Sequence, residues 1–403
     1  MDFKPPVSSP LETTADPNHV VVNIGPSHPA THGTIQIIAE IDGETVKRAD
    51  VHCGYLHRGF EKEAEAHPYH NIIPYTDRLN YCSALNNNFA YAAAVESLLG
   101  IELTPRCIVL RTLLAEYNRI ADHVTCIAAS VMEMGGMTAF LYLMTVRDYI
   151  FEHLNHLTGA RLTYSFVRIG GLGRDLPDGW LVRLEEILQF TETYVERIHG
   201  MLDRNGIFLG RTRDVAAMST AHALHWGYTG PILRSTGLAM DLRKDQPYLA
   251  YAELDFDVPV GIKGDNYDRY YVRMCEIDES ISMVRQCVQM LPGGPVTVKD
   301  PRVVLPEKQL VYKQIEALIH HFKLVTEGVQ VPAGEVYVAH EAPNGELGFY
   351  CVSDGSGRPA KLHVRAPSFV HMGGMHTLLE GHGISDIVPT FGSMNMVGGE
   401  CDR

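Results

Sequence analysis

The sequence predicts an α+β protein in which a central helical bundle is layered with α+β structure from both ends of the chain. Residues 20–58 and 334–365 contain short β-forming runs separated by Asp-Gly and Asn-Gly turn signals, which is typical of β-hairpins. The middle of the chain instead repeats apolar residues at helical spacing. The length of 403 residues allows two or three domains.

These patterns divide the chain into four segments. We expect a flexible arm at 1–19, an N-terminal β-rich α+β domain at 20–75, a central helical domain at 76–325 and a C-terminal β-rich segment at 326–403. The arm is rich in Pro, Ser and Thr and has no apolar core, so it does not resemble a signal peptide. An arm that wraps a partner subunit is the alternative interpretation.

Turn signals locate the strands at the two ends of the chain. Asp42-Gly43 and Pro343-Asn344-Gly345 each separate two β-forming runs, as in a hairpin. Strands are expected at 20–24, 34–40, 45–51, 334–339, 345–353 and 360–365.

Helix start and stop signals locate the elements between them. Thr104-Pro105 marks a start, and Gly100 and Gly159 mark two ends. Helices are expected at 86–99, 104–120, 138–157, 177–202, 274–291 and 307–325. Residues 124–146 are long and apolar enough to span a bilayer, but they contain Glu133 and Gly135-Gly136, so we expect two buried helices meeting at a break.

Charge and cysteine spacing exclude several classes of protein. The 34 basic and 48 acidic residues give a net charge of −14, which argues against nucleic-acid binding because that role needs a basic face. The eight cysteines include no C-x-x-C pair, and the twenty histidines no H-E-x-x-H. No G-x-G-x-x-G follows a predicted strand. We therefore expect this chain to bind no metal and no dinucleotide of its own and to form no disulfide framework; a metal site assembled from residues distant in the sequence is the alternative.

Two loops, one with two histidines and one with an arginine and a tyrosine, are candidates for chemistry. His28 and His32 lie in a Gly- and Pro-framed loop between two strands, where a histidine can donate a proton near neutral pH. A stiff loop with capped or solvated histidines is the alternative. Arg78 and Tyr81 precede a helix, where a phenol and a cation could bind a carbonyl ligand. A helix cap with a packed tyrosine is the alternative.

Two acidic residues are further candidates. Glu133 lies in an apolar stretch, where a carboxylate is costly to bury and would have a raised pKa unless a partner holds it. Arg58 and Glu61 are three residues apart beside Gly59, a spacing that suits an ion pair but is common on surfaces.

Together these motifs resemble one family. The chain contains, among others, the motifs G-P-S-H-P-A-T-H-G, G-Y-L-H-R-G-F-E-K, T-D-R-L-N-Y, F-V-R-I-G-G, L-R-K, F-D-V-P, R-A-P-S-F and the closing G-E-C-D-R. With these motifs the chain resembles the D subunit, or 49-kDa subunit, of proton-pumping NADH:quinone oxidoreductase (respiratory complex I). The resemblance covers the chain from about Val20 to Arg403.

That family is itself similar to the large subunit of nickel–iron hydrogenases, which implies a hydrogenase-large-subunit-like fold. In hydrogenases two C-x-x-C pairs hold the metal centre. Here the matching positions are Asn80, Ser83, Val397 and Glu400, which supply no thiolates. A hydrogenase-type metal site is therefore not expected, although a hydrogenase-related subunit or a non-catalytic scaffold remain alternatives.

The resemblance implies roles for five residues. His32 and Tyr81 would hydrogen-bond the quinone, and Arg58 and Arg78 would lie beside an iron–sulfur cluster that a neighbouring subunit holds. Glu133 stands where the family usually has Asp, the hydrogen-bond partner of the histidine. Many members also have a histidine near the cluster where this chain has Thr163. We hypothesise that the cluster potential is accordingly low and varies little with pH, which a redox titration at several pH values tests.

The resemblance also implies where the chain works. It would be a peripheral subunit on the cytoplasmic face of the bacterial inner membrane, or on the matrix face in mitochondria. Its partners would be the cluster-carrying subunit, the C subunit of the 30-kDa type, a membrane-arm subunit at the quinone channel, and quinone itself. Quinone reduction here would be coupled to proton pumping in the membrane arm.

Overall fold

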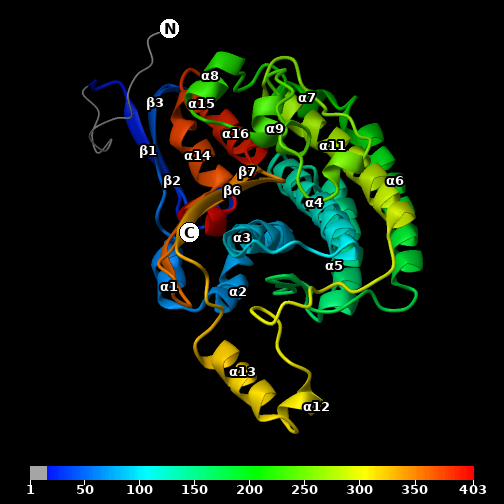
Figure 1. Ribbon diagram of the computed structural model, residues 1–403. Coiled ribbons are helices and arrows are strands. Elements are labelled where there is room, and N and C mark those ends of the chain that lie inside the picture. The colour runs from blue at the N-terminus through cyan, green and yellow to red at the C-terminus, as the bar shows by residue number, and fades with distance from the viewer. Residues whose placement is uncertain (1–15) are drawn as a thin grey trace.

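The computed structural model describes residues 16–403, and it confirms the α+β class (Figure 1). The arm expected at 1–19 falls mostly on residues 1–15, which lie outside the described residues. A helical body occupies one side of the molecule, and two small antiparallel sheets lie on the other side, one from each end of the chain. The domain boundaries at 20, 76 and 326 stay predictions.

The N-terminal sheet has the predicted hairpin. Its antiparallel order is β1-β2-β3, and the turn at Asp42-Gly43 connects the last two strands. Gly43 has a φ of +62°, which glycine adopts without a clash from a Cβ atom. The strands are β1 (Val20–Ile24), β2 (Gln36–Asp42) and β3 (Thr45–His52).

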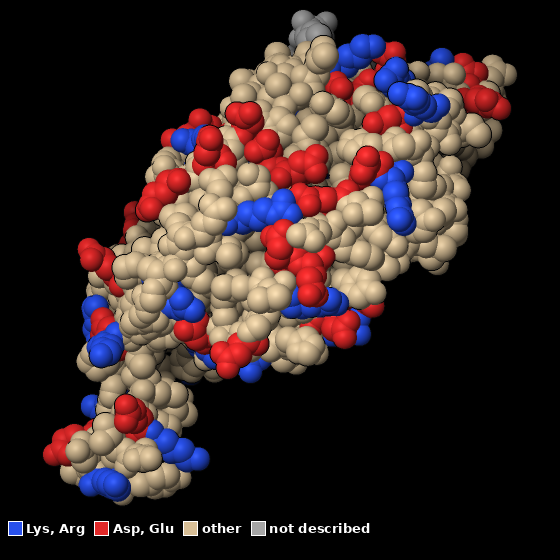
Figure 2. All heavy atoms as spheres, turned by 90° about the vertical axis from the view of Figure 1, so that its right-hand side faces the viewer, with Lys and Arg blue, Asp and Glu red and all other residues tan. Residues whose placement is uncertain are grey.

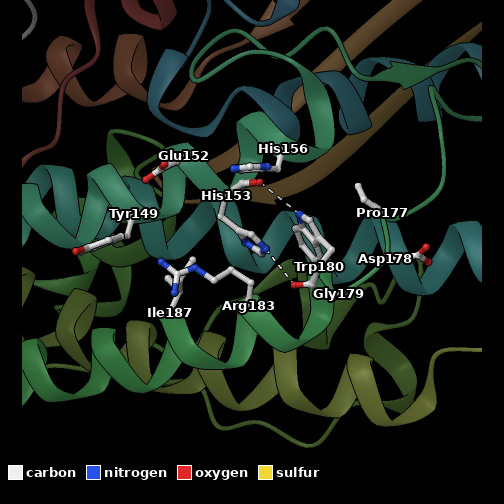
Figure 3. Close-up of a pocket in the computed structure, with 10 residues that line it drawn as sticks. All are labelled: Tyr149, Glu152, His153, His156, Pro177, Asp178, Gly179, Trp180, Arg183 and Ile187. Atoms are coloured by element: carbon white, nitrogen blue, oxygen red, sulfur yellow. Dashed lines mark hydrogen bonds between the residues drawn. The ribbon is translucent and has the colours of Figure 1, made fainter.

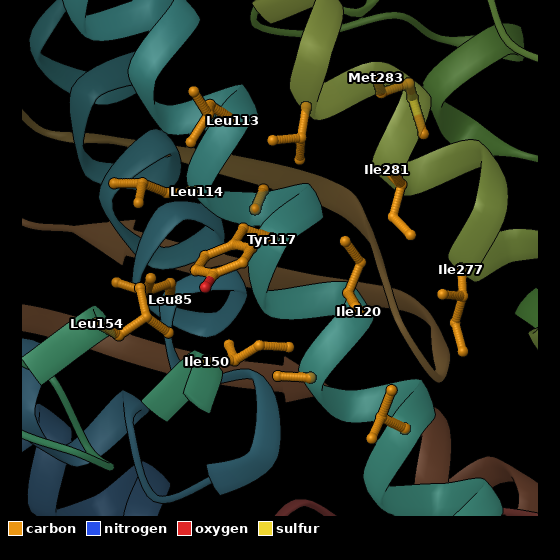
Figure 4. Packing of buried hydrophobic residues seen from close by; sticks show 14 of the residues in the cluster. Leu85, Leu113, Leu114, Tyr117, Ile120, Ile150, Leu154, Ile277, Ile281 and Met283 are labelled. Carbon is orange, nitrogen blue, oxygen red and sulfur yellow. The ribbon is translucent and has the colours of Figure 1, made fainter. Parts of the chain in front are cut away.

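The helical body is organised around one long central helix. Residue Thr104 caps its start by accepting a hydrogen bond from the Cys107 amide, as the sequence predicts. Apolar side chains of this helix pack between those of its neighbours on both sides (Figure 4). The main helices are α3 (Ala84–Leu99), α4 (Pro105–Glu133), α5 (Met137–Thr158), α6 (Trp180–Leu202) and α11 (Asn266–Met290), with α4 between α5 and α11.

The apolar stretch 124–146 is divided as predicted. Helix α4 ends at Glu133 and α5 begins at Met137. Gly135 adopts a φ of +89°, and a Cβ on Gly136 would lie 2.3 Å from the Val131 side chain, so both glycines are needed at the break. Among residues 16–403, no helix is both long and apolar enough to cross a bilayer.

The C-terminal part begins as a sheet and ends in short helices. The order is β6-β7-β8, and this sheet packs on α3 and on α1. The strands are β6 (Gly334–Ala342), β7 (Gly345–Ser353) and β8 (Pro359–Arg365), and the helices are α14 (Pro367–Gly374), α15 (His376–Leu379), α16 (Ile387–Ser393) and α17 (Gly398–Asp402). The segment predicted to be β-rich is therefore helical beyond Arg365.

The remaining elements are short and mostly connect the larger ones. They are α1 (Phe60–Ala66), α2 (Ile73–Thr76), β4 (Val167–Arg168), β5 (Gly171–Leu172), α7 (Gly206–Thr212), α8 (Thr220–His225), α9 (Gly230–Arg234), α10 (Leu242–Asp245), α12 (Lys308–Val311) and α13 (Ile315–Thr326), with 3-10 turns at Pro29–Thr31, Tyr69–Asn71, Tyr81–Ser83, Tyr251–Glu253 and Ile384–Asp386.

Three predicted helices are wrong in extent. The helix expected at 104–120 continues to Glu133 as α4. The helix expected at 274–291 begins eight residues earlier, at Asn266, because the Asp265 side chain caps it. The single helix expected at 307–325 is divided into α12 and α13, which project from the body (Figure 1).

A buried ionic cluster crosses the helical body. It joins α4, α9, α10, α11 and β6, and each of its three guanidinium groups contacts at least one carboxylate within 3.1 Å. Its members are Arg119, Arg234, Arg243, Glu116, Asp241, Glu276 and Glu341, all nearly inaccessible to solvent. Burial of such charges is tolerated only when they are paired, and here they are.

Acidic and basic side chains are interspersed on the described part of the face shown in Figure 2. That face therefore presents no continuous basic area, in keeping with the acidic composition.

Candidate functional site

The C-terminal segment, residues 391–399, connects the predicted site residues. The Phe391 ring lies 6.1 Å from the His32 ring, between centroids. A Cβ on Gly392 would lie 2.5 Å from Glu133 Oε2, and one on Gly399 would lie 2.4 Å from the Arg78 carbonyl oxygen. The glycines thus let this segment pass directly against three regions that are far apart in the sequence.

Arg58, Arg78 and Tyr81 lie together at one edge of this segment. Arg58 Nη2 donates to the carbonyl oxygens of Arg78, at 3.0 Å, and Gly399, at 2.8 Å. Arg78 Nη1 donates to the carbonyl oxygen of Pro74, and its nearest carboxylate, Asp77, is 3.9 Å away. The described residues place no carboxylate within ion-pair distance of Arg58, so the positive charge at this edge is poorly compensated.

Tyr81 is exposed at this edge instead of packed into a helix. Its side chain is 38% exposed, and no group among residues 16–403 hydrogen-bonds its hydroxyl. Asn80, not Tyr81, caps the following turn by accepting from the Cys82 amide. Desolvation by its surroundings raises the pKa of Tyr81, so the phenol stays protonated and can donate a hydrogen bond.

Behind Tyr81 a chain of buried hydrogen bonds joins the segment around Asn80 to the segment around Asn395. Asn80 donates to Asp122 at 2.7 Å, and Asn395 donates to the other oxygen of Asp122 at 2.8 Å. Asn395 also donates to Asn344, which in turn donates to Glu400 at 3.3 Å. The structure therefore brings these two segments together, but links them through amides and carboxylates that lack thiolate chemistry.

Glu400, at the end of this series of hydrogen bonds, has a raised pKa. Burial raises its pKa to about 7, although Ser368 and Asn344 donate to its Oε2. Its Oε1 is buried without a hydrogen-bond partner among the described residues. The carboxyl group is thus poised to carry a proton near neutral pH.

His28 and His32 have different environments in the predicted loop. His28 Nδ1 accepts from the Ala30 amide at 3.2 Å, so His28 caps a 3-10 turn, which is the structural alternative. His32 ends that turn with a φ of +55°, and its ring forms no hydrogen bond with any described residue. Desolvation lowers the pKa of His32, which keeps the imidazole neutral at neutral pH.

Glu133 is the last residue of α4, at the helix break. Its Oε2 is buried without a hydrogen-bond partner among the described residues, and desolvation raises its pKa to about 8. The expected hydrogen bond between Glu133 and His32 is not formed within the described chain; both side chains instead border α16, at Gly392 and Phe391. The carboxyl group therefore holds its own proton at neutral pH.

Glu61 and Thr163 are two further residues that the sequence analysis singled out. Glu61 does not pair with Arg58; it lies 2.9 Å from His363 and 3.4 Å from Arg403. Thr163 has a φ of +54° in a segment that Asp77 fixes by accepting from the Ser165 amide at 2.8 Å. The segment that contains Thr163 is thus fixed to Asp77, and the hypothesis on cluster potential stays a prediction.

The cavity drawn in Figure 3 lies elsewhere, between α5 and α6. It encloses about 320 Å³, and its histidine is fixed: His153 stacks on Trp180 at 4.1 Å and lies 3.1 Å from both the Tyr117 hydroxyl and the Trp180 carbonyl oxygen. Burial lowers the pKa of His153 to about 4. A neutral, fully bonded histidine serves packing better than proton transfer.

Comparison with known proteins agrees with this geometry. A family model described as "Respiratory-chain NADH dehydrogenase, 49 Kd subunit" matches residues 133–403. The chain is 78% identical to the D subunit of the NADH-quinone oxidoreductase of Pelobacter propionicus over the full length of both, and 48% identical to that of Myxococcus xanthus over 98% of this chain and 95% of the relative. It is also 48% identical to the C/D subunit of the Bdellovibrio bacteriovorus enzyme, over 96% of this chain and 69% of the relative.

The site therefore combines a positively charged edge, a phenol that no described group binds, and a chain of buried hydrogen bonds behind it. The chain belongs to the family of the 49-kDa subunit, or D subunit, of NADH-quinone oxidoreductase. Asp122, Asn395 and Glu400 form the buried hydrogen bonds behind Tyr81, and reasoning from the sequence assigned no role to the first two. Asp122 within an apolar helical repeat was the one available signal.

Proposed function

We propose that this chain forms the quinone-reduction site of an NADH-quinone oxidoreductase together with a neighbouring subunit that carries an iron–sulfur cluster. The observation that supports this most strongly is the edge formed by Arg58, Arg78 and Tyr81, where two guanidinium groups bound mainly to backbone carbonyls flank an unoccupied phenol. Positive charge that nearby carboxylates offset only in part favours the reduced form of an adjacent cluster.

Tyr81 and His32 act as hydrogen-bond donors to the two ends of the quinone headgroup. Their polar groups are unoccupied in the described chain, and both stay neutral at neutral pH because of their shifted pKa values. The cluster of the partner subunit supplies the electrons when it is bound. Conversion of quinone to quinol takes two electrons and two protons. The Tyr81 phenol can supply one proton as a general acid, whereas neutral His32 donates only a hydrogen bond, and the second proton comes from the buried carboxyl groups behind the headgroup.

Glu133 and Glu400 are proposed to hold and return protons behind the headgroup. Burial gives them pKa values of about 8 and about 7, so each changes charge easily near neutral pH. A change in charge at Glu133, at the end of α4 and against α16, is the step that we propose couples quinone reduction to proton pumping by the membrane arm.

An assembled complex also accounts for the projecting helices. Helix α13 buries none of its residues, and its apolar side chains at 315, 318, 319, 322 and 325 recur at helical spacing while remaining exposed. Exposed apolar stripes of this kind mark contacts with other subunits. The fused C/D subunit of the Bdellovibrio relative supports a separate C subunit as one partner of this chain. We place the complex at the cytoplasmic face of the inner membrane, with this chain as a peripheral subunit.

Photolabelling tests this assignment. A photoreactive quinone analogue, added to the intact complex, is expected to label peptides that contain Tyr81 or His32, and excess quinone should prevent the labelling. Competed label found only in other subunits, or only at the cavity around His153, would refute the proposed site.

A further inference from the structure

Two cysteines and a carboxylate from opposite ends of the chain meet beside α17. The sulfur atoms of Cys53 and Cys401 and a carboxylate oxygen of Asp402 all lie within 4.8 Å of one another. Cys53 follows β3 and is half-buried, whereas Cys401 and Asp402 are buried in α17. No C-x-x-C spacing marks this group in the sequence, because its cysteines are adjacent only in the folded chain.

The loop after β3 holds the carboxylate in place. The amides of Gly54 and Leu56 donate to Asp402 Oδ1 and Oδ2, at 2.9 Å and 2.7 Å, and His57 Nδ1 lies 2.7 Å from the Asp402 carbonyl oxygen. Each carboxylate oxygen retains a lone pair after one such bond. A ligand group fixed by surrounding hydrogen bonds loses little entropy when it binds a metal ion.

The two thiols also contact each other directly. The Cys401 thiol hydrogen-bonds with Cys53, beside the carboxylate of Asp402. The two sulfur atoms and the carboxylate oxygen lie close enough together for one cation to contact all three. The group lines a surface pocket of about 370 Å³ that includes His57, so an ion can reach it from solvent.

We propose that Cys53, Cys401 and Asp402 form a binding site for a thiophilic divalent cation of the Zn²⁺ type. Two thiolates and a carboxylate are donors that Zn²⁺ prefers, and three protein ligands leave the fourth tetrahedral position to solvent. Binding releases the two thiol protons to solvent, and no electron is transferred. Occupancy would clamp α17 to the loop after β3, independently of the quinone chemistry proposed above.

Differential alkylation of the intact wild-type complex tests this site. The complex is treated with a chelator, exposed to Zn²⁺ or to Mg²⁺, and alkylated without oxygen; labelled peptides are then quantified by mass spectrometry. Zn²⁺ is expected to slow alkylation of Cys53 by about tenfold or more, because a coordinated thiolate does not react as a free one. Mg²⁺, which prefers oxygen ligands, is expected to have no effect.

Cys275 and Cys401 provide the controls. Cys275 is also half-buried but belongs to no such group among the described residues, and its labelling should not respond to Zn²⁺. Cys401→Ala should leave Cys53 reactive and remove its protection. The proposal is overturned if Zn²⁺ fails to protect Cys53 in the wild type, if protection persists in Cys401→Ala, or if the complex isolated without oxygen contains a Cys53–Cys401 disulfide. The wild-type comparison of Zn²⁺ with Mg²⁺ decides the question even if the variant does not assemble.

Discussion

The arginines of the buried ionic cluster and those at the Tyr81 edge are held in opposite ways. Arg234 contacts Glu276 at 2.9 Å and Glu341 at 2.8 Å, deep in the helical body. Arg58 instead donates to two backbone carbonyl oxygens and faces no carboxylate within ion-pair distance in the described chain. Carboxylates cancel the charge of the first group and leave it a structural role. Carbonyl oxygens orient the second group, and Asp77, 3.9 Å from Arg78, offsets only part of its charge.

Breaking the buried cluster should have the largest effect. Glu276→Gln leaves Arg234 and His123 without their shared carboxylate, to which they lie 2.9 Å and 2.8 Å away. We expect a loss of about 3–5 kcal/mol, a large part of the stability of a typical domain. The measurement is the yield and thermal unfolding of the assembled complex.

The same change at the surface is the control. Glu192→Gln removes an exposed carboxylate that pairs with Arg285, and Arg285 lies on α11, as Glu276 does. The change should cost at most about 1 kcal/mol of stability. Equal losses in the two variants would mean that the buried cluster is not needed for stability.

Removing charge from the Tyr81 edge should affect activity instead of assembly. Arg58→Met is expected to lower quinone reduction by about tenfold or more, because stabilisation of the electron-accepting state is lost. Reduction of an artificial acceptor by NADH should be unchanged. Arg48→Met, in β3, removes an exposed arginine that lies 4.0 Å from Glu40 and is the matched control. If Arg58→Met destabilises the complex but keeps quinone turnover, the arginines at the Tyr81 edge have the same structural role as those of the buried cluster.

The pH dependence of stability gives a smaller test at Glu133, whose buried Oε2 has no hydrogen-bond partner among the described residues. Its pKa is raised from 4.5 to about 8 in the folded chain, so the folded state binds this proton more tightly than the unfolded state. Stability should therefore fall as pH rises through that interval, and the fall should be absent in Glu133→Gln.

The thermal midpoint of both complexes, measured across the interval, gives the comparison. Glu186→Gln, at an exposed position on α6, should retain the wild-type dependence. A difference between wild type and Glu133→Gln that does not change with pH would show that this carboxyl group has no raised pKa.

Local signals in the sequence predicted the elements that depend on a few adjacent residues. Asp42-Gly43 gave the hairpin, and Gly135-Gly136 gave the break between α4 and α5. The start of α11 was missed because Arg269 and Arg273 are buried there, and buried arginines do not contribute to an apolar repeat. The division between α12 and α13 contains neither Gly nor Pro.

The candidate site shows the same division between local and distant contacts. Arg78 and Tyr81 are three residues apart, so one motif predicted their proximity, and Arg58 joined them through the resemblance. The contacts of Asp122 with Asn80 and Asn395 and the meeting of Cys53 with Cys401 depend on the folded path of residues 391–402. No local pattern encodes such contacts, because they arise only when the chain ends pack together.

The central claim is that the Tyr81 hydroxyl serves quinone, and Tyr81→Phe tests it most directly. The change removes one oxygen atom from a side chain that hydrogen-bonds no described residue, so the fold should persist. Electron transfer from NADH to an artificial acceptor should stay intact in the assembled complex, while quinone reduction should fall by about 10²-fold or more. Normal quinone turnover in the Tyr81→Phe complex would contradict the account.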